Sequence, residues 1–486
     1  MPQLRDSGTR SLHATEPVPS AEMEGFCRIF GVETEYGVAV TGAERPVDAG
    51  QVAMTMFQPI VSRSRSTNTY LANGSRLYLD VGSHPEYATA EARDPREALA
   101  QDLAGEHVMR NLALKAQRKL RESYGAHATI HVFKNNVDSA GHAFGCHENY
   151  LVRRFVPLET IEHQLLPFLI TRQLYTGAGR MTPDGFQITQ RADFLDEAVS
   201  SATTRSRPMV NTRDEPHADP DSFRRLHVII GDSNRSQWST WMKLAVTHLV
   251  LCAIEDAFRH GVPSGFEQYA FADPAAANRT VSRFLDNPRA ELTLESGESV
   301  SALGLQRRYY AAVKAFIETH GDALAGSLPA TTIDTIMGEW SRVLDALERG
   351  AYDALADRVD WAAKKRLFDA LKRRRPDVTF AQMEQLELDY HDIANGRLYG
   401  SLVARNQMRE LLTGDNVEYA VHNPPTDTRA ALRGRFVDAA LNVGAQFSAD
   451  WTHLALTAPE RREAILLDPF EAEPTLGFEQ LMEALN

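Results

Sequence analysis

Cysteine, basic charge and long apolar runs are all scarce in this chain of 486 residues. There are three cysteines, Cys27, Cys146 and Cys252, which are too few and too scattered for a disulfide framework or a zinc cluster. This scarcity is typical of a reducing cytoplasm. A formal net charge of −13 argues against nucleic acid as the main partner, because contacts to phosphates require a basic surface. No apolar run reaches membrane-spanning length, so we expect a cytoplasmic protein that binds neither membrane nor nucleic acid.

The rest of the composition is that of a globular protein, with 43% hydrophobic and 24% charged residues. Strand-like runs alternate with helices up to about residue 235, and helices then dominate up to about residue 395. The stretch "HNPPTDTRA", at residues 422–430, has the composition of a boundary. The predicted organisation is a disordered leader over 1–26, a large domain over 27–420 and a small C-terminal domain over 421–486.

Long helices are predicted where an apolar periodicity has clear ends. One begins at Pro95, after a capping aspartate, and ends at Gly125; another runs from residue 157 to the glycines near residue 177. In the tail, helices are predicted near 430–443 and 458–466. Because the strands come early, without a regular βαβ rhythm, we expect an α+β fold with a mostly antiparallel sheet.

Three strand-like segments have one polar and one apolar face, since alternate residues of a strand share a face. The polar faces carry Arg76, Tyr78 and Asp80 in "RLYLDV", Glu33 and Glu35 in "VETEYG", and Arg225 and His227 in "RRLHVIIG". One interpretation is a solvated face, which antiparallel sheets often have. The other is a cation site, because paired acidic residues on one face repel each other unless a cation lies between them.

A magnesium site is the sharper of these two interpretations, because Mg²⁺ prefers carboxylate oxygens that it shares with substrate phosphates. Glu33, Glu35 and Glu86 are its predicted ligands, with His147 and His227 as weaker candidates that are equally compatible with structural histidines. Asp80, which we expect to lie outside the metal cluster, is a candidate general base; the alternative is a cap of the following turn.

An arginine-containing segment with little periodicity is the other unusual feature. The run "SSATTRSRPMVNTRDEPHAD", at residues 200–219, holds Arg205, Arg207 and Arg213 among small hydroxyl residues. Guanidinium groups can clamp a carboxylate or a phosphate with two parallel hydrogen bonds. An exposed polar loop is the alternative for this segment.

Six segments in a fixed order resemble one family. They are "GVETEYG", "NGSRLYLDVGSHPEYATAE", "FKNNVDS", "GCHENYL", "SSATTRSRPMVNTRDEPHAD" and "RRLHVIIGDSN". Together they resemble the Pup ligase family, densely over residues 28–235 and more loosely beyond. The resemblance implies a glutamine-synthetase-like carboxylate-amine ligase. In that fold a curved antiparallel sheet forms a cradle for ATP and Mg²⁺, flanked by helices, with a small C-terminal domain beside it.

The same resemblance implies a reaction and a set of roles. The family joins the C-terminal glutamate of Pup, a small disordered acidic protein, to lysines of substrate proteins through a γ-glutamyl phosphate and finally an isopeptide bond. The implied roles are Mg²⁺ ligands for Glu33, Tyr78 and Glu86, contacts to ATP for Arg76, Thr89 and Trp451, and proton acceptor for Asp80. Arg205, Arg207 and Arg213 are candidates for binding the glutamate or the phosphate.

Three other functions are also compatible with the sequence. A sister branch of the family deamidates Pup and removes it from proteins, but it carries a long insertion between the first glutamate motif and the catalytic aspartate. Only 47 positions separate Glu33 from Asp80 here, which leaves little room for that insertion. The others are a non-catalytic scaffold that binds Pup and a γ-glutamyl ligase that acts on small molecules.

Overall fold

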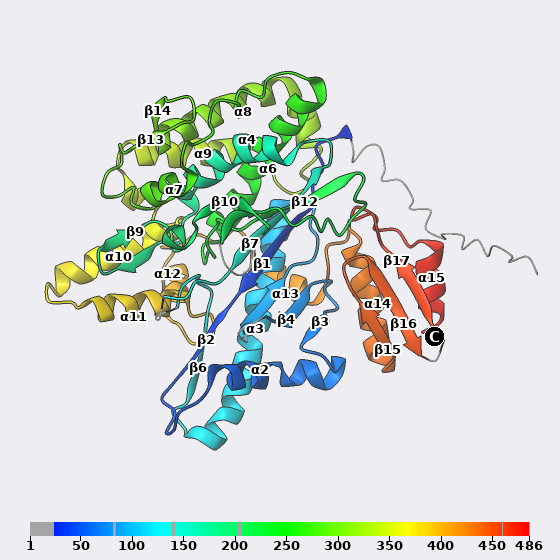
Figure 1. The fold of residues 1–486 in the computed structure, drawn as a ribbon. Helices are drawn as coiled ribbons and strands as arrows, with labels where there is room; N and C mark the ends of the chain where they lie inside the picture. The colour runs from blue at the N-terminus through cyan, green and yellow to red at the C-terminus, as the bar shows by residue number, and fades with distance from the viewer. Residues whose placement is uncertain (1–23, 81–83, 139–140, 202–206, 459, 486) are drawn as a thin grey trace, which may run out of the picture.

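An eight-stranded sheet forms the centre of the protein. This computed structural model describes residues 24–80, 84–138, 141–201, 207–458 and 460–485 (Figure 1). The strand order is β10-β11-β12-β7-β1-β5-β4-β3, and every neighbouring pair is antiparallel except β10 and β11. The strands are β1 (Phe30–Glu35), β3 (Asn68–Tyr70), β4 (Arg76–Leu79), β5 (Pro85–Ala88), β7 (Cys146–Arg153), β10 (Glu197–Ser200), β11 (Pro208–Asn211) and β12 (Phe223–Val228). The predicted α+β class with a mostly antiparallel sheet is confirmed.

The register of the central strands places polar side chains together on one face. Glu33 on β1 is the partner of His147 on β7 and of Ala88 on β5. On the next pair of strands, Tyr78 is the partner of Glu86. Cα partners in an antiparallel pair project to the same side of the sheet. The face predicted from alternation is therefore continuous across β4, β5, β1, β7 and β12.

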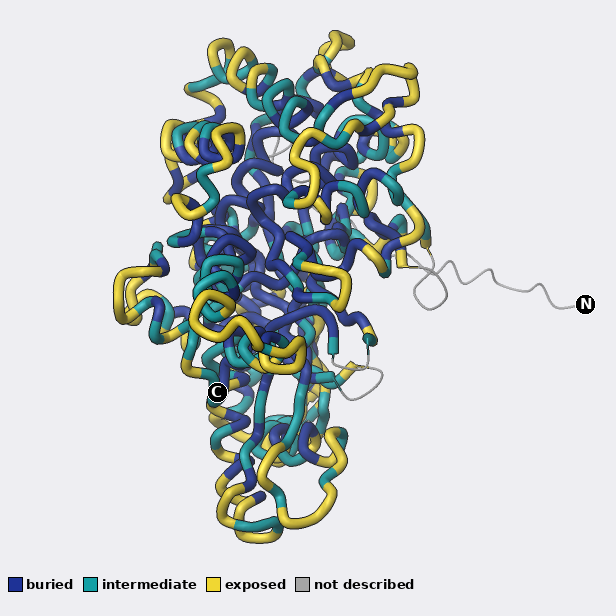
Figure 2. Tube along the Cα trace, turned by 90° about the vertical axis from the view of Figure 1, so that its left-hand side faces the viewer, coloured by how far each residue is buried: buried dark blue, intermediate teal, exposed yellow. Residues whose placement is uncertain are grey.

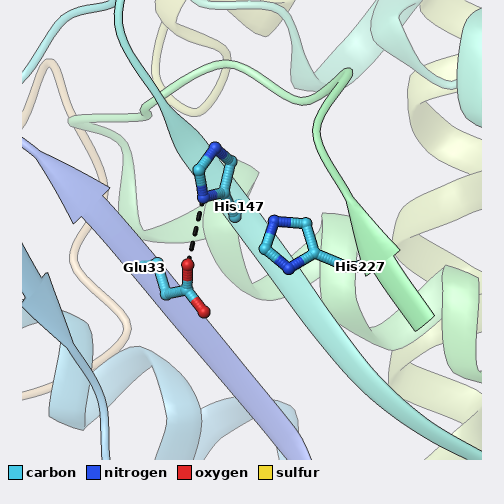
Figure 3. Close-up of side chains that lie close together, drawn as sticks. All are labelled: Glu33, His147 and His227. Atoms are coloured by element: carbon cyan, nitrogen blue, oxygen red, sulfur yellow. Dashed lines mark hydrogen bonds and ion pairs between the residues drawn. The ribbon is translucent and has the colours of Figure 1, made fainter. Parts of the chain in front are cut away.

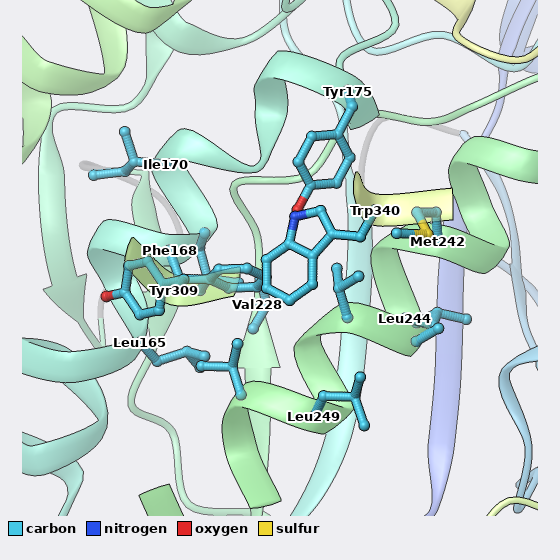
Figure 4. Close-up of a cluster of buried hydrophobic side chains, with 14 of the residues drawn as sticks. Leu165, Phe168, Ile170, Tyr175, Val228, Met242, Leu244, Leu249, Tyr309 and Trp340 are labelled. Atoms are coloured by element: carbon cyan, nitrogen blue, oxygen red, sulfur yellow. The ribbon is translucent and has the colours of Figure 1, made fainter. Parts of the chain in front are cut away.

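The opposite face of the sheet packs against helices and forms the main core. Val32, Tyr150 and Val228 are buried there, each at most 4% exposed. Figure 4 shows part of this core, where the Phe168 ring lies 5.9 Å from Trp340, centroid to centroid. Figure 2 shows the buried segments running along the middle of the molecule, with exposed segments around them. The apolar half of each strand thus fixes which way the polar half points.

Helices supply most of the remaining chain, and several of them lie together above the sheet in Figure 1. Those before the C-terminal unit are α2 (Ala49–Ser64), α3 (Pro95–Tyr124), α4 (Leu158–Thr171), α5 (Gln173–Thr176), α6 (Gln237–His260), α7 (Pro274–Ser282), α8 (Ala302–Ala325), α9 (Ile333–Glu348), α10 (Asp360–Arg374), α11 (Phe380–His391), α12 (Leu398–Ala404) and α13 (Gly414–His422), with short 3-10 turns at Ala192–Phe194 and Tyr352–Leu355. Two-stranded pairs join β2 (Gly37–Thr41) to β6 (Thr129–Phe133), β8 (Arg180–Thr182) to β9 (Gly185–Gln187), and β13 (Glu291–Thr293) to β14 (Ser299–Ser301). None of the helices in the described ranges is both long enough and apolar enough to cross a bilayer.

The predicted helix ends are confirmed where capping residues are present. At the start of α3, Asp94 accepts a hydrogen bond from the backbone N–H of Arg96 at 2.7 Å, and the helix ends before Gly125, whose φ is 102°. The helix predicted from residue 157 is two helices, because it is interrupted at Arg172 between α4 and α5. The second helix, α5, is followed by Gly177. Capping residues therefore marked the helix ends, whereas the apolar periodicity did not reveal the interruption.

The end of the chain forms a compact unit beside β3. It consists of α14 (Ala430–Val443), β15 (Gln446–Ala449), β16 (His453–Ala458), β17 (Arg462–Ile465) and α15 (Leu476–Glu483). The three strands form a separate sheet, and Tyr70 of β3 joins the apolar core of this unit. The helix predicted at 458–466 is wrong, because Ala464 and Leu466 alternate with exposed residues and pack as a strand. The helix predicted at 430–443 is confirmed.

Candidate functional site

Glu33 lies at the centre of the polar face and accepts hydrogen bonds from two neighbouring strands. Its carboxylate lies 3.1 Å from Nδ1 of His147 (Figure 3) and 3.1 Å from Nδ2 of Asn149; both residues are on β7. Arg225 on β12 reaches the same carboxylate at 3.4 Å through Nη1. Burial would raise the pKa of Glu33, but the hydrogen bond from His147, electrostatic interactions with both histidines and the charge of Arg225 hold this pKa well below its usual range. Glu33 is therefore ionised at neutral pH.

The two histidines beside Glu33 carry their protons on different ring nitrogens. The His147 and His227 ring centroids lie 4.7 Å apart, and the ligand atoms of both lie within 4.8 Å of Glu33. A neutral His147 that donates through Nδ1 keeps a lone pair on Nε2, the arrangement typical of a metal-binding histidine. In His227, Nδ1 lies 2.7 Å from Nη1 of Arg225, which can only donate. Burial lowers the pKa of His227 to about 3, so this ring is neutral and carries its proton on Nε2.

Three carboxylates form a second group on the polar face, next to Glu33. Glu35, Asp80 and Glu86 each offer an oxygen within 4.8 Å of the others. The hydroxyl of Tyr78 donates to Glu86, and the backbone N–H of Gly145 donates to Glu35 at 2.8 Å. Burial raises the pKa of Glu86 well above its usual range, and the charges of Glu33 and Glu35 raise it further. The crowding of these carboxylates therefore disfavours an ionised Glu86 unless a cation lies beside it.

Asp80 lies beside the acidic cluster rather than apart from it, and its place outside the metal ligands stays a prediction. The chain turns back after β4, and the backbone N–H of Asp80 donates to the carbonyl of His84 at 2.9 Å. This turn brings the exposed carboxylate of Asp80 beside Glu86, which comes from the next strand. A general base and a cation ligand are thus both compatible with its position.

The oxygen-only group suits Mg²⁺ better than the group with two histidines. Mg²⁺ prefers carboxylate and phosphate oxygens, whereas imidazole is the ligand favoured by zinc, copper, nickel and iron. The crowded carboxylates Glu35, Asp80 and Glu86 are the kind of donor set that a divalent cation stabilises. Glu33 borders both groups, because it lies one strand step from Glu35. The predicted role of Tyr78 as a ligand stays a prediction, since its hydroxyl is engaged with Glu86.

A pocket adjoins the Glu33 end of the polar face. It is lined by Gly31, Glu33, Thr89, Arg225 and Trp451, together with apolar residues of β1 and β7. The indole of Trp451 closes one side and lies edge-on to Tyr70, with 5.2 Å between ring centroids. The hydroxyl oxygen of Thr89 accepts a hydrogen bond from the backbone N–H of Val32 at 3.0 Å. Two residues predicted to contact ATP, far apart in sequence, therefore line one pocket.

Arg76 lies on the same face but not in the lining of that pocket, among the residues the structure describes. Its Nε donates to Asn68 at 2.9 Å, and its guanidinium carbon lies 4.2 Å from the centroid of the Tyr78 ring. Arg76 therefore lies nearer to the acidic cluster than Trp451 does. A contact with the phosphate end of a nucleotide fits this position better than a contact with the base.

The predicted arginine clamp is only partly described. Arg205 lies outside the described residues, whereas Arg207 and Arg213 flank the two ends of β11. The guanidinium of Arg207 donates to the carbonyl of Ala143, and Nε of Arg213 lies 3.5 Å from Glu215. Both are exposed, so they are accessible to a ligand above the face. Their binding role stays a prediction.

Two residues that contact Glu33 were not predicted as site residues. Asn149 follows His147 by two positions, and Arg225 precedes His227 by two, so the alternation that selected the histidines also selects them. Composition did not mark them, because a lone asparagine or arginine on a strand is usually solvated. Their contacts to Glu33 became visible only through the register of β1, β7 and β12.

Gly145 gives the first testable prediction, because a side chain there has no room. A β-carbon at this position would lie 2.6 Å from Nε2 of His147 and 2.8 Å from a carboxylate oxygen of Glu35. Both neighbours are ends of side chains, so Gly145→Ala is expected to displace them at little cost to folding. We expect catalysis to fall roughly 10-fold, as for changes that misplace ligand side chains. Gly141→Ala is the spatial control, because its β-carbon meets nothing within 4 Å among the residues that the structure describes, although its positive φ is itself strained for alanine.

Steady-state kinetics and thermal melting of the two variants test this account of Gly145. A Gly145→Ala protein that is folded and fully active would contradict the claim that His147 and Glu35 act in the site. A large loss of melting temperature would instead assign Gly145 to folding.

Comparison with known proteins gives consistent matches. The family model described as Pup-ligase protein matches residues 28–455. A Pup–protein ligase of Bifidobacterium longum (strain NCC 2705) is 99% identical over 486 residues, covering 100% of both chains. A Pup–protein ligase of Bifidobacterium dentium is 63% identical over 487 residues, again covering 100% of both.

Two solved structures are similar over most of their length. The ligase PafA, in a crystal structure of its complex with the prokaryotic ubiquitin-like protein Pup, is 37% identical with a TM-score of 0.85, over 95% of this chain and 92% of that one. A structure of PafA in complex with ADP is 38% identical with a TM-score of 0.77, over 91% of this chain and 94% of that one.

Proposed function

Because the chain belongs to the Pup-ligase family, we infer that it is an ATP-dependent ligase that joins Pup to proteins. It links the C-terminal glutamate of Pup to lysine ε-amines. The observation that carries this inference is a carboxylate-rich sheet face that adjoins a pocket lined by Thr89 and Trp451, in a chain 99% identical to a Pup–protein ligase. The related PafA has been solved with ADP, which supports ATP as the co-substrate.

The order of residues along β1 suggests how the nucleotide lies. Gly31 lines the pocket, Glu33 borders both the pocket and the acidic cluster, and Glu35 belongs to the cluster. These three residues span roughly 13 Å, at about 3.3 Å per residue of strand. We place the base beside Trp451 and the phosphates toward Glu35 and Asp80. Arg76 then lies close enough to contact the phosphates.

Magnesium fits this placement through the oxygen ligands of the cluster. We propose that Glu35 and Glu86 hold it, with Glu33 at the edge of the site, while Tyr78 orients Glu86 through its hydroxyl. When bound, Mg²⁺ neutralises negative charge on the phosphoryl group that is transferred. His147 and His227 then serve Glu33 and the substrate through hydrogen bonds, because their nitrogens suit Mg²⁺ less well than oxygens do.

The reaction consists of a phosphoryl transfer followed by an acyl transfer. In the first, a γ-carboxylate oxygen of the Pup glutamate attacks the γ-phosphorus of ATP, and ADP leaves. In the second, the lysine nitrogen attacks the γ-carbonyl carbon, and the bond from that carbon to the phosphate oxygen breaks. The attacking amine must lose a proton, since the reference pKa of lysine is about 10.4. We assign that proton to the carboxylate of Asp80, which is exposed and therefore reachable by a bulky protein substrate.

Pup and lysine-bearing proteins are the partners, and Pup is seen with the related PafA. We propose that Arg207 and Arg213, at the rim of the site, bind the carboxylates of the Pup terminus; Arg205, outside the described residues, stays a sequence-based candidate for the same role. A cytoplasmic location and domain limits of 27–420 and 421–486 are further proposals. The second limit falls within the last turn of α13, which ends at His422.

A conjugation assay tests this function. The protein is incubated with ATP, Mg²⁺, Pup ending in glutamate and a lysine-bearing substrate, and we expect a conjugate to form with release of ADP. Substrate with its lysines acetylated is the control, since it cannot attack. Cleavage of a preformed conjugate without synthesis would favour the deamidase and depupylase branch. Pup binding without any turnover would favour the scaffold, and activity on free cysteine or ammonia a small-molecule ligase.

A further inference from the structure

We propose that Glu91, Arg429 and Arg433 form a positioning clamp that fixes Trp451 as a wall of the nucleotide pocket. The clamp joins the end of β5 to helix α14 and so connects the eight-stranded sheet to the C-terminal unit. This inference rests on the proposed function, because it takes the pocket at Trp451 as the nucleotide site. It adds ion-paired residues, two of which line that pocket.

Arg433 contacts both the ring and the backbone of Trp451. Its guanidinium carbon lies 4.8 Å from the centroid of the Trp451 ring and 5.4 Å from that of Tyr70. Its Nη1 also donates to the backbone carbonyl of Trp451 at 3.2 Å. A stacked guanidinium and a backbone hydrogen bond together fix both the ring and the turn that carries it.

The guanidinium of Arg433 is in turn anchored to the sheet. Its Nε donates to the carbonyl of Gly74 at 2.9 Å, and both terminal nitrogens donate to the carboxylate of Glu91, one of them at 3.1 Å. Arg433 is fully buried and Glu91 is 7% exposed. Because a buried paired charge cannot move without leaving its partner unpaired, this anchor is rigid.

Arg429, the residue directly before α14, completes the clamp. Its Nε donates to Glu91 at 2.8 Å, and its Nη1 donates to the carbonyl of Leu466 beyond β17 at 2.9 Å. Two guanidinium groups thus share one carboxylate. Burial would raise the pKa of Glu91, but the charges of Arg433 and Arg429 lower it to about 2, so the carboxylate stays ionised at working pH. One positive charge is left over beside a pocket proposed to take a polyanion.

The backbone also fits closely where the clamp crosses between the two units. A β-carbon on Gly434 would lie 2.3 Å from the carbonyl oxygen of Ala72, and one on Gly74 would lie 3.1 Å from Ala430. Helix α14 therefore sits directly on the turn between β3 and β4. This close fit helps to fix the position of Trp451 relative to the sheet.

A nucleotide-binding measurement with Arg433→Lys tests the clamp. Lysine keeps the charge but loses the planar fork and the stacking, so Trp451 is expected to lose its fixed position. Calorimetric titration with ADP and Mg²⁺ is expected to give a roughly 10-fold weaker affinity, the scale of one lost base–aromatic contact. At saturating ATP, kcat and the KM for Pup are expected to stay unchanged. Arg435→Lys, an exposed arginine two positions along the same helix, is the matched control.

A double-mutant cycle separates positioning from a general structural role. In a Trp451→Ala background, Arg433→Lys is expected to cause no further loss of ADP affinity, because the clamp acts through the indole. An equal loss in both backgrounds, or none in either, would overturn the proposal. If Arg433→Lys does not fold, Glu91→Gln takes its place in the same cycle. Wild-type protein that fails to bind ADP would instead contradict the proposed function.

Discussion

Asp80→Asn is expected to lower the rate of conjugation about 10²- to 10⁴-fold, the range for loss of a positioned general base. Asparagine keeps the shape of the side chain but cannot accept the amine proton as the bond to the glutamate carbon forms. ADP affinity is expected to stay near the wild-type value, because Asp80 lies at the far end of the polar face from Trp451. Single-turnover conjugation and calorimetric ADP binding measure the two effects separately.

The position of Asp80 beside Glu35 and Glu86 requires a further arm in this experiment. If Asp80 acted mainly by holding Mg²⁺, raising the Mg²⁺ concentration would restore the activity of Asp80→Asn. We expect no such rescue, and a hydroxylamine nucleophile, which is largely unprotonated at neutral pH, should recover part of the rate. Full rescue by Mg²⁺ would replace the base with a ligand role. Asp377→Asn, in the exposed turn between α10 and α11, is the matched control.

Glu33→Gln is expected to lower conjugation about 100-fold, in line with the loss of a group that organises a metal site. The carboxylate accepts from His147, Asn149 and Arg225 at once, and glutamine would turn an N–H₂ group against at least one of these donors. The loss of charge also leaves Arg225 without its carboxylate partner in the site. Unlike Asp80→Asn, this change is expected to weaken ADP and Mg²⁺ binding together with catalysis.

Two measurements decide whether Glu33 acts in this way. The Mg²⁺ concentration at half-maximal rate is expected to rise in Glu33→Gln, whereas Glu197→Gln, an exposed glutamate on edge strand β10, should match the wild type. Wild-type Mg²⁺ dependence with reduced activity would show that Glu33 orients its neighbouring side chains but does not contribute to Mg²⁺ binding. Wild-type activity would remove Glu33 from the site.

Alternation in the sequence was sufficient to predict the polar face. Glu33 and Glu35 had to share a side because Val32 and Tyr36 are apolar, and both of these are buried. The α+β class and the ends of α3 followed from equally local signals. These features depend on the period of a strand and on capping, which neighbouring residues decide.

Other features depend on contacts that no local pattern contains. Asp80 joins Glu86 only because two strands fold back on each other across a turn. Trp451 reaches Thr89 only because the C-terminal unit docks on β3, and Glu91 gave no signal because a buried ion pair looks like surface charge in a sequence. The strand at β17 was predicted as a helix because its short apolar run fits both periods.

We propose that one sheet face binds ATP with its base at Trp451 and a cation at Glu35 and Glu86. Crystals grown with Mn²⁺ and a non-hydrolysable ATP analogue test it most directly, because Mn²⁺ replaces Mg²⁺ and gives an anomalous signal. We predict an anomalous peak in direct contact with oxygens of Glu35 and Glu86, and the adenine against the Trp451 indole. A peak away from both carboxylates, or a base bound away from Trp451, would rule out this arrangement.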